Sequence, residues 1–87
     1  MTGTSTFLTV GFLGMAAGLI TKVATQKMAE ANNANPYALL VGFSLPVMIG
    51  GSLGAWKLSN DETLGWTWII GVVTGEVVAG IYESTQK

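Results

Sequence analysis

The hydrophobic positions of this chain fall into three long stretches separated by short polar segments. Residues 2–21 and 36–56 carry no charged side chain, and residues 64–82 carry one. Each stretch is long enough for a helix to cross a hydrocarbon core of about 30 Å at about 1.5 Å per residue. In the second stretch the apolar side chains point around the whole helix, which is typical of a helix surrounded by lipid. The pattern predicts an all-α fold with three transmembrane helices.

Polar residues set the expected ends of these helices. Residues 22–31 are good helix formers, so the first helix is expected to continue beyond its apolar stretch. Asn35 followed by Pro36 supplies a capping amide and a first-turn proline for the second helix. Ser59 and Glu62 have the capping-box spacing at the start of the third. The expected spans are about residues 4–30, 36–57 and 62–83, within a single unit of residues 1–87.

The connection between the second and third stretches predicts a hairpin. Residues 57–63 form a short polar segment that suits only a tight turn between antiparallel neighbours. Aromatic residues agree with this layout, because Trp and Tyr concentrate at membrane interfaces. Three tryptophans lie beside the turn and two tyrosines lie at the opposite ends of the spans. The expected interface anchors are Trp56, Trp66, Trp68, Tyr37 and Tyr82.

The lysines indicate an orientation for the three spans. In a three-span plan Lys57 is expected on one side of the membrane, and the other lysines, Lys22, Lys27 and Lys87, on the opposite side. Because positive charge is enriched on the cytoplasmic side, the C-terminus is expected in the cytoplasm. A signal peptide is a less favoured interpretation of the first stretch, since residues 1–6 carry no Lys or Arg.

Glycines recur at a fixed spacing in every apolar stretch. The chain has 12 glycines, each of which would cost a helix in water about 1 kcal/mol relative to alanine. Small residues on one helix face let a partner helix approach closely, and such packing is a main association force in lipid. The expected helix-packing residues are Gly11, Gly14, Gly18, Gly50, Gly54, Gly71 and Gly75. The spacing leaves open whether they pack within one chain or between copies, but three short helices offer more small-residue surface than they can use on each other.

Glu76 is the one charged residue inside an apolar stretch. A carboxylate in a membrane span is costly and by default marks a functional site. Lys22 is the expected partner, because the three-span plan places both residues near the same interface. Three interpretations stay open for this candidate site: a structural ion pair or hydrogen bond between helices, the handling of a proton or cation, and plain exposure of the carboxylate.

Composition narrows the classes of function. Hydrophobic residues make up 49% of the chain and charged residues 10%, and Cys, His and Arg are all missing. The chain therefore lacks the commonest general base, the thiolate ligand and the guanidinium that grips phosphate, so no enzyme, metal or cofactor is expected. A net charge of -1 argues against nucleic acid as a partner. Bound lipid, and chlorophyll held through a carbonyl, amide or water, stay open.

These observations together predict a non-catalytic subunit of a membrane-derived assembly, which associates through glycine-mediated helix packing. Its expected partners are the lipid bilayer and copies of itself or other membrane subunits. The first alternative is a small homo-oligomeric channel or carrier that uses Glu76. The glycine-rich apolar helices, few charges and short loop also resemble the subunits of conjugation pili, a resemblance that implies a lipid-containing filament as the second alternative.

Overall fold

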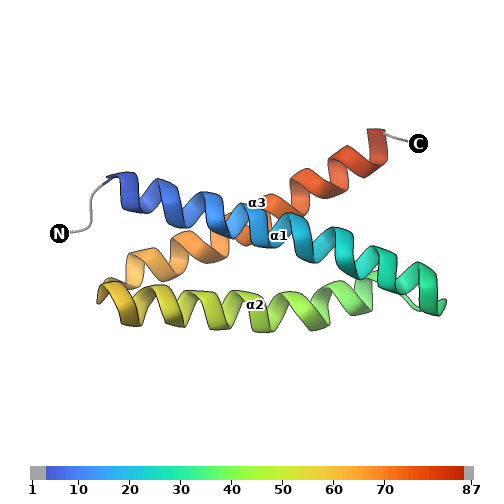
Figure 1. Cartoon of the computed structure of the whole chain (residues 1–87), viewed down its shortest axis with the longest axis horizontal. Coiled ribbons are helices and arrows are strands. Elements are labelled where there is room, and N and C mark those ends of the chain that lie inside the picture. The colour runs from blue at the N-terminus through green and yellow to red at the C-terminus, as the bar shows by residue number, and fades with distance from the viewer. Residues whose placement is uncertain (1–3, 86–87) are drawn as a thin grey trace.

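Three helices make up residues 4–85, the part of the chain that the computed structural model describes (Figure 1). Helix α1 spans Thr4–Asn32, α2 spans Pro36–Ser59 and α3 spans Glu62–Thr85. Each helix is long and apolar enough to cross a membrane, and the described residues contain no strand. The prediction of an all-α, three-helix chain is confirmed. The helices end at residues 32, 59 and 85, slightly beyond the expected 30, 57 and 83.

The turn between α1 and α2 has the expected chemistry. Asn33 follows α1 in the left-handed conformation, with φ of 52°, which Asn tolerates better than most residues. Asn35 then caps α2, because its side-chain oxygen accepts a hydrogen bond from the backbone N–H of Tyr37 at 2.9 Å. Pro36 occupies the first turn, where its missing N–H costs nothing. The predicted start of the second helix is confirmed.

The turn between α2 and α3 differs from the expected capping box. Ser59 belongs to the last turn of α2, where its hydroxyl donates to a carbonyl of that turn. Asn60 ends the helix in the left-handed conformation, with φ of 58°. Asp61 takes the capping role instead, because its Oδ1 accepts a hydrogen bond from the N–H of Thr63 at 3.0 Å. The extra helical residues of α2 move the cap from Ser59 to Asp61.

The three helices form a flat bundle of 46 × 24 × 12 Å (Figure 1). Helices α1 and α3 cross near their middles and run in the same direction, whereas α2 runs antiparallel beside them. In its most apolar window α3 is 33% buried, compared with 11% for α1 and 6% for α2, so α3 is the central helix. The longest dimension exceeds a hydrocarbon core of about 30 Å and is close to a bilayer with its headgroups.

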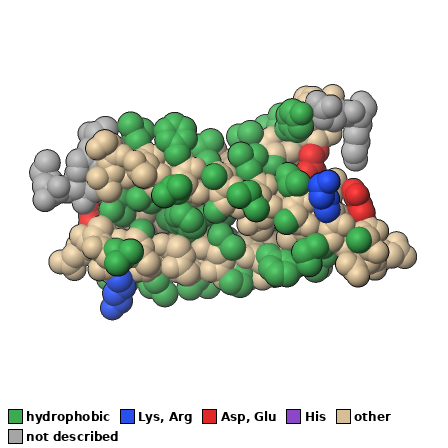
Figure 2. All heavy atoms as spheres, viewed as in Figure 1, with side chains coloured by type: hydrophobic (Ala, Val, Ile, Leu, Met, Phe, Trp, Pro, Cys, Tyr) green, Lys and Arg blue, Asp and Glu red, His purple; other side chains and the backbone are tan. Residues whose placement is uncertain are grey.

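Few large side chains are buried in this bundle. Leu64 and Val72 of α3 are the largest fully buried ones, with 2% and 0% of their surface exposed. Most large apolar residues point outward, and Figure 2 shows hydrophobic side chains covering the visible face between two ends that carry the charges. In water such a surface would be unfavourable by about 25 cal/mol per Å², whereas lipid tails are themselves apolar. The outer surface is therefore suited to lipid.

Candidate functional site

Helices α1 and α3 approach each other closely through four buried glycines. Gly14 and Gly18 of α1 face Gly71 and Gly75 of α3, and we call these residues the glycine crossing. A Cβ atom added to Gly14 would lie 3.2 Å from the Cα of Gly71 and 2.8 Å from a carbonyl oxygen of α3. A Cβ on Gly71 would in turn lie 3.1 Å from the Cα of Gly14. The two backbones therefore touch without intervening side chains.

None of the four positions of the glycine crossing has room for a side chain, and the overlap is most severe at two of them. A Cβ on Gly18 would overlap the carbonyl oxygen of Val72, and a Cβ on Gly75 would overlap that of Met15. These neighbours are backbone atoms, so relief would require the whole helices to separate. Gly11 lies at the edge, where an added Cβ would be 3.8 Å from the Thr67 methyl, an ordinary contact. The structure thus brings the expected glycine pairs of the first and third helices together within one chain.

The glycine pair of α2 has no partner in the chain. A Cβ on Gly50 or Gly54 would meet no atom within 4 Å, and the same holds for Gly42. These glycines continue a row of small or compact residues spaced by four, which we call the α2 groove: Ala38, Gly42, Pro46, Gly50 and Gly54. All are exposed except Gly54, which is half-buried. The α2 groove is open along the outer side of the helix.

Large residues form a second row directly beside the α2 groove. This α2 ridge consists of Val41, Leu45, Ile49 and Leu53, which are 58%, 50%, 56% and 46% exposed. Rows spaced by four residues are the ridges and grooves through which helices most often pack. One face of α2 therefore presents a groove and a matching ridge side by side.

Glu76 links α3 to α2. Its carboxylate accepts a hydrogen bond from the hydroxyl of Ser44, which is 4% exposed and is the one buried residue of α2. Glu76 is itself half-buried beside the glycine crossing, since its backbone N would lie 3.1 Å from a Cβ on Gly18. The acid within the predicted span is thus held by a neutral donor from a neighbouring helix.

Lys22 bonds a different acid from the one expected. Its Nζ lies 3.0 Å from Oε2 of Glu83 and donates to Oε1 of Gln26 at 2.9 Å. The side chains of the ion pair are 17% and 26% exposed. The expected pairing with Glu76 is therefore replaced by pairing with Glu83.

The register of the glycine crossing explains this difference. Gly18 lies opposite Glu76, and α1 and α3 run in the same direction, so the residue one turn beyond Gly18 lies further along α3. That residue is Lys22, whose Cε would be 4.0 Å from a Cβ on Gly80. From there its long side chain extends toward the end of the bundle, as Lys side chains commonly do near an interface, and reaches Glu83.

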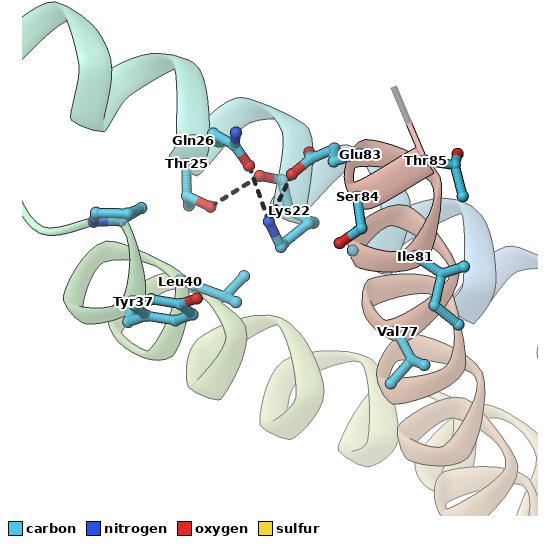
Figure 3. A pocket seen from close by; sticks show the side chains of 12 residues that line it. Lys22, Thr25, Gln26, Tyr37, Leu40, Val77, Ile81, Glu83, Ser84 and Thr85 are labelled. Atoms are coloured by element: carbon cyan, nitrogen blue, oxygen red, sulfur yellow. Dashed lines mark hydrogen bonds and ion pairs between the residues drawn. The ribbon is translucent and has the colours of Figure 1, made fainter. Parts of the chain in front are cut away.

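The helices diverge beyond the glycine crossing and enclose a cleft of about 600 Å³ at the end where α2 begins (Figure 3). Lys22, Gln26 and Glu83 line one part of it, and Leu40 and Ile81 line another. We call this space the Lys22 cleft. It combines charged and apolar walls in one opening.

The aromatic residues occupy three kinds of position. Trp56 and Trp66 are 43% and 63% exposed and line a smaller hollow of about 250 Å³ between α2 and α3. Tyr37, in the first turn of α2, and Tyr82, near the end of α3, are 74% and 64% exposed. Trp68 is different, because its side chain packs between the helices. Its assignment as an interface anchor does not describe the contacts that it makes.

The indole ring of Trp68 packs directly against the α2 backbone at Gly51. Its Nε1–H donates to the carbonyl oxygen of Val47 at 3.0 Å. A Cβ on Gly51 would overlap the indole ring, so the glycine at this position makes room for it. Gly51 thus serves packing within the chain, unlike its neighbour Gly50.

Sequence reasoning did not single out Ser44, Gly51 or Glu83. A polar residue in an otherwise apolar span was an available signal for Ser44, as it was for Glu76. Glu83 lies seven residues after Glu76 and hence near the same helical face, so it was an equally good candidate for Lys22. Gly51 carried no signal that distinguishes it from Gly50.

Metal-ligand clusters are absent from residues 4–85, where no group of three or more His, Cys, Asp or Glu side chains is placed to hold an ion. The buried polar groups bond one another, as Glu76 does with Ser44 and Lys22 does with Glu83. The α2 groove with its ridge and the Lys22 cleft are the open features that bear on function. The chain matches no known protein family, and no curated protein or solved structure is similar to it.

Proposed function

We propose that this protein is a non-catalytic subunit of a membrane assembly and that α2 is the helix through which it associates. The observation that carries the proposal is the contrast between filled and open glycines. The glycine crossing is buried, whereas Gly42, Gly50 and Gly54 face open space. A glycine weakens a helix by about 1 kcal/mol relative to alanine, and close packing is the compensation that membrane helices gain from it.

The shape of this face favours a second copy of the chain as the partner. The α2 groove and α2 ridge lie side by side, so the ridge of one copy fits the groove of another while the reverse contact forms about a twofold axis. Within this contact Gly50 lies in the groove and Ile49 lies beside it in the ridge, the latter 56% exposed. A neighbouring subunit with a similar ridge fits the same groove.

The proposal includes an orientation in the bilayer. The end of α1 and the start of α2 lie at one end of the bundle with Lys22 and Lys27, whereas Lys57 lies at the other end. The preference of positive charge for the cytoplasmic side then favours an N-terminus outside and a C-terminus in the cytoplasm. A cysteine scan with impermeant thiol reagents on intact cells would test this, and labelling of Lys57→Cys from the cytoplasmic side alone would contradict it.

Substitutions on the open face test the association directly. A Cβ on Gly50 or Gly54 meets no atom within 4 Å, so Gly50→Leu and Gly54→Leu add bulk to the α2 groove from positions that have room for it. We expect both variants to fold and to lose oligomers or co-purified subunits in native mass spectrometry after gentle extraction. Ala16→Leu adds similar bulk to an exposed position on α1 and should change nothing. Unchanged association in both glycine variants would overturn the proposal.

The composition and size of the wild-type assembly in native mass spectrometry distinguish three kinds of membrane subunit. A fixed ratio to other proteins would favour an accessory subunit, a small homo-oligomer would favour a self-associating one, and filament fragments would favour a pilus-like one.

Glu76 supports a second candidate, a small oligomeric channel or carrier. The specific observation is a half-buried carboxylate near the middle of α3 that has one hydrogen-bond donor from another helix. Glu76→Gln keeps the shape and the hydrogen-bond acceptor while removing the charge. In reconstituted liposomes, loss of proton or cation flux with unchanged assembly would favour transport, whereas a wild-type protein without flux would exclude this candidate.

A further inference from the structure

We propose that the Lys22 cleft binds one phospholipid whose headgroup carries both a phosphate and a primary amine. The inference rests on the proposed membrane location, but it does not depend on association through α2. The cleft opens where the helices diverge at the end of the bundle, and Figure 3 shows its polar and apolar side chains facing the same space. Its volume of about 600 Å³ is within the range of about 300–1,000 Å³ that is usual for small-molecule sites.

The charged wall of the cleft still has a hydrogen-bond donor and hydrogen-bond acceptors to offer to a ligand. The Lys22 ammonium has three donors and uses two, one for Glu83 and one for Gln26. Glu83 lines the cleft and accepts from Lys22 through Oε2, so its second carboxylate oxygen adds further acceptor capacity. A phosphate beside Lys22 and an ammonium beside Glu83 would extend this pair into a four-charge network.

The balance of charge selects a zwitterion over an anion. Lys22 and Glu83 cancel each other, and they are the two charged residues that line the cleft. An anionic headgroup would leave Glu83 facing a negative charge, while a quaternary amine would give its carboxylate no N–H to accept. A primary ammonium provides both the positive charge and three donors.

The apolar wall accounts for a lipid rather than a soluble zwitterion. Leu40, Val77 and Ile81 line the cleft from α2 and α3. Val77 and Ile81 are 55% and 60% exposed and continue along the outside of α3 toward the middle of the bundle. Acyl chains that leave the cleft in this direction would enter the hydrocarbon region while the headgroup stays at the level of Lys22.

Competition among defined lipids tests the headgroup preference. The full-length protein in detergent is mixed with equal amounts of dioleoyl phosphatidylethanolamine, phosphatidylcholine and phosphatidylglycerol, and adducts are counted by native mass spectrometry. We expect one preferred adduct, with phosphatidylethanolamine. Equal adducts with all three lipids, or a preference for the anionic one, would overturn the proposal.

Two variants and their controls locate the site. Lys22→Met should lower the preference for phosphatidylethanolamine by about tenfold or more, because it removes a charged hydrogen bond. Lys27→Met, an exposed lysine of the same helix outside the cleft, should leave it unchanged. Gly80→Leu fills the cleft at a position where an added Cβ makes only an ordinary contact at 4.0 Å, so the variant should fold but lose the adduct. Retention of the adduct in Gly80→Leu would contradict the assigned site.

Competition with soluble phosphoethanolamine tests whether the cleft binds a free headgroup or needs the whole lipid. At millimolar concentration it should fail to displace the bound lipid, because it lacks the chains that contact Val77 and Ile81. Displacement by phosphoethanolamine would overturn the assignment of a lipid. None of these outcomes depends on oligomer mass, so failure here and failure of the association proposal are distinguishable.

Discussion

Substitution of Gly75 by alanine should separate α1 from α3. The added Cβ would overlap the Met15 carbonyl oxygen and lie 2.9 Å from both the carbonyl carbon and the Cα of Met15. The optimal separation of non-bonded carbon atoms is about 3.5–4.0 Å, so the helices must move apart by roughly 1 Å. Overpacking of this kind costs about 1–3 kcal/mol. The better helix propensity of alanine offsets about 1 kcal/mol of that loss.

Gly42→Ala is the matched control for this experiment. It makes the same chemical change within a helix and gains the same propensity, but its Cβ meets no atom within 4 Å. The difference in unfolding free energy between Gly75→Ala and Gly42→Ala therefore reports the clash alone, about 1–3 kcal/mol. Reversible unfolding of dilute protein by sodium dodecyl sulfate in mixed micelles, followed by circular dichroism, measures it. Because Gly42 lies in the α2 groove, the protein is kept dilute, so that a change in association between copies does not alter the measured stability of the control.

Equal stability of the two variants would refute the close approach of α1 and α3. A substitution at Gly71 must be interpreted with the same care. The spacing of the glycines alone suggests that Gly71 packs against another helix, but not whether that helix belongs to the same chain. Because Gly71 lies in the glycine crossing, its substitution perturbs folding of the single chain first. Loss of oligomers in a Gly71 variant therefore says nothing about contacts between copies unless the monomer is shown to be folded.

Two hydrogen bonds between helices give further predictions. Trp68→Phe keeps most of the ring but removes the N–H that donates to Val47, so stability should fall by about 0.5–1.5 kcal/mol in the same unfolding assay; no change would mean that the bond adds nothing beyond ring packing. Ser44→Ala removes the donor to Glu76 and should cost about 1–3 kcal/mol, whereas Ser52→Ala, whose hydroxyl bonds only its own helix, should cost less. Equal losses in the two serine variants would contradict a specific role of the bond between Ser44 and Glu76.

The helices were predictable because their signals are local. Length, absence of charge and the pair Asn35–Pro36 decide a span and its start without reference to the rest of the chain. The start of α3 shows the limit of such signals, since Ser59 and Asp61 both offer capping oxygens. The choice between them depended on how far α2 continues, which is set by packing as well as by the local residues.

The pairing of the helices was not predictable from the same residues. All three helices carry glycine pairs of equal spacing, so the spacing alone does not say that α1 meets α3 or that Gly50 stays open. The partner of Lys22 depended on that choice. Glu76 and Glu83 are separated by two helical turns, about 10 Å along the axis, and only the depth of the glycine crossing decides which one a lysine of α1 can reach.

The glycine crossing also constrains the order in which the chain can assemble during synthesis. Its two halves are separated in the sequence by the whole of α2, so Gly14 and Gly18 are synthesised well before Gly71 and Gly75. When a chain enters the membrane from its N-terminus, α1 has no α3 to pack against until α2 and most of α3 have been synthesised. A ribosome that stalls after α2 would therefore leave Gly14 and Gly18 uncovered, and such a fragment would be a natural target for membrane quality control.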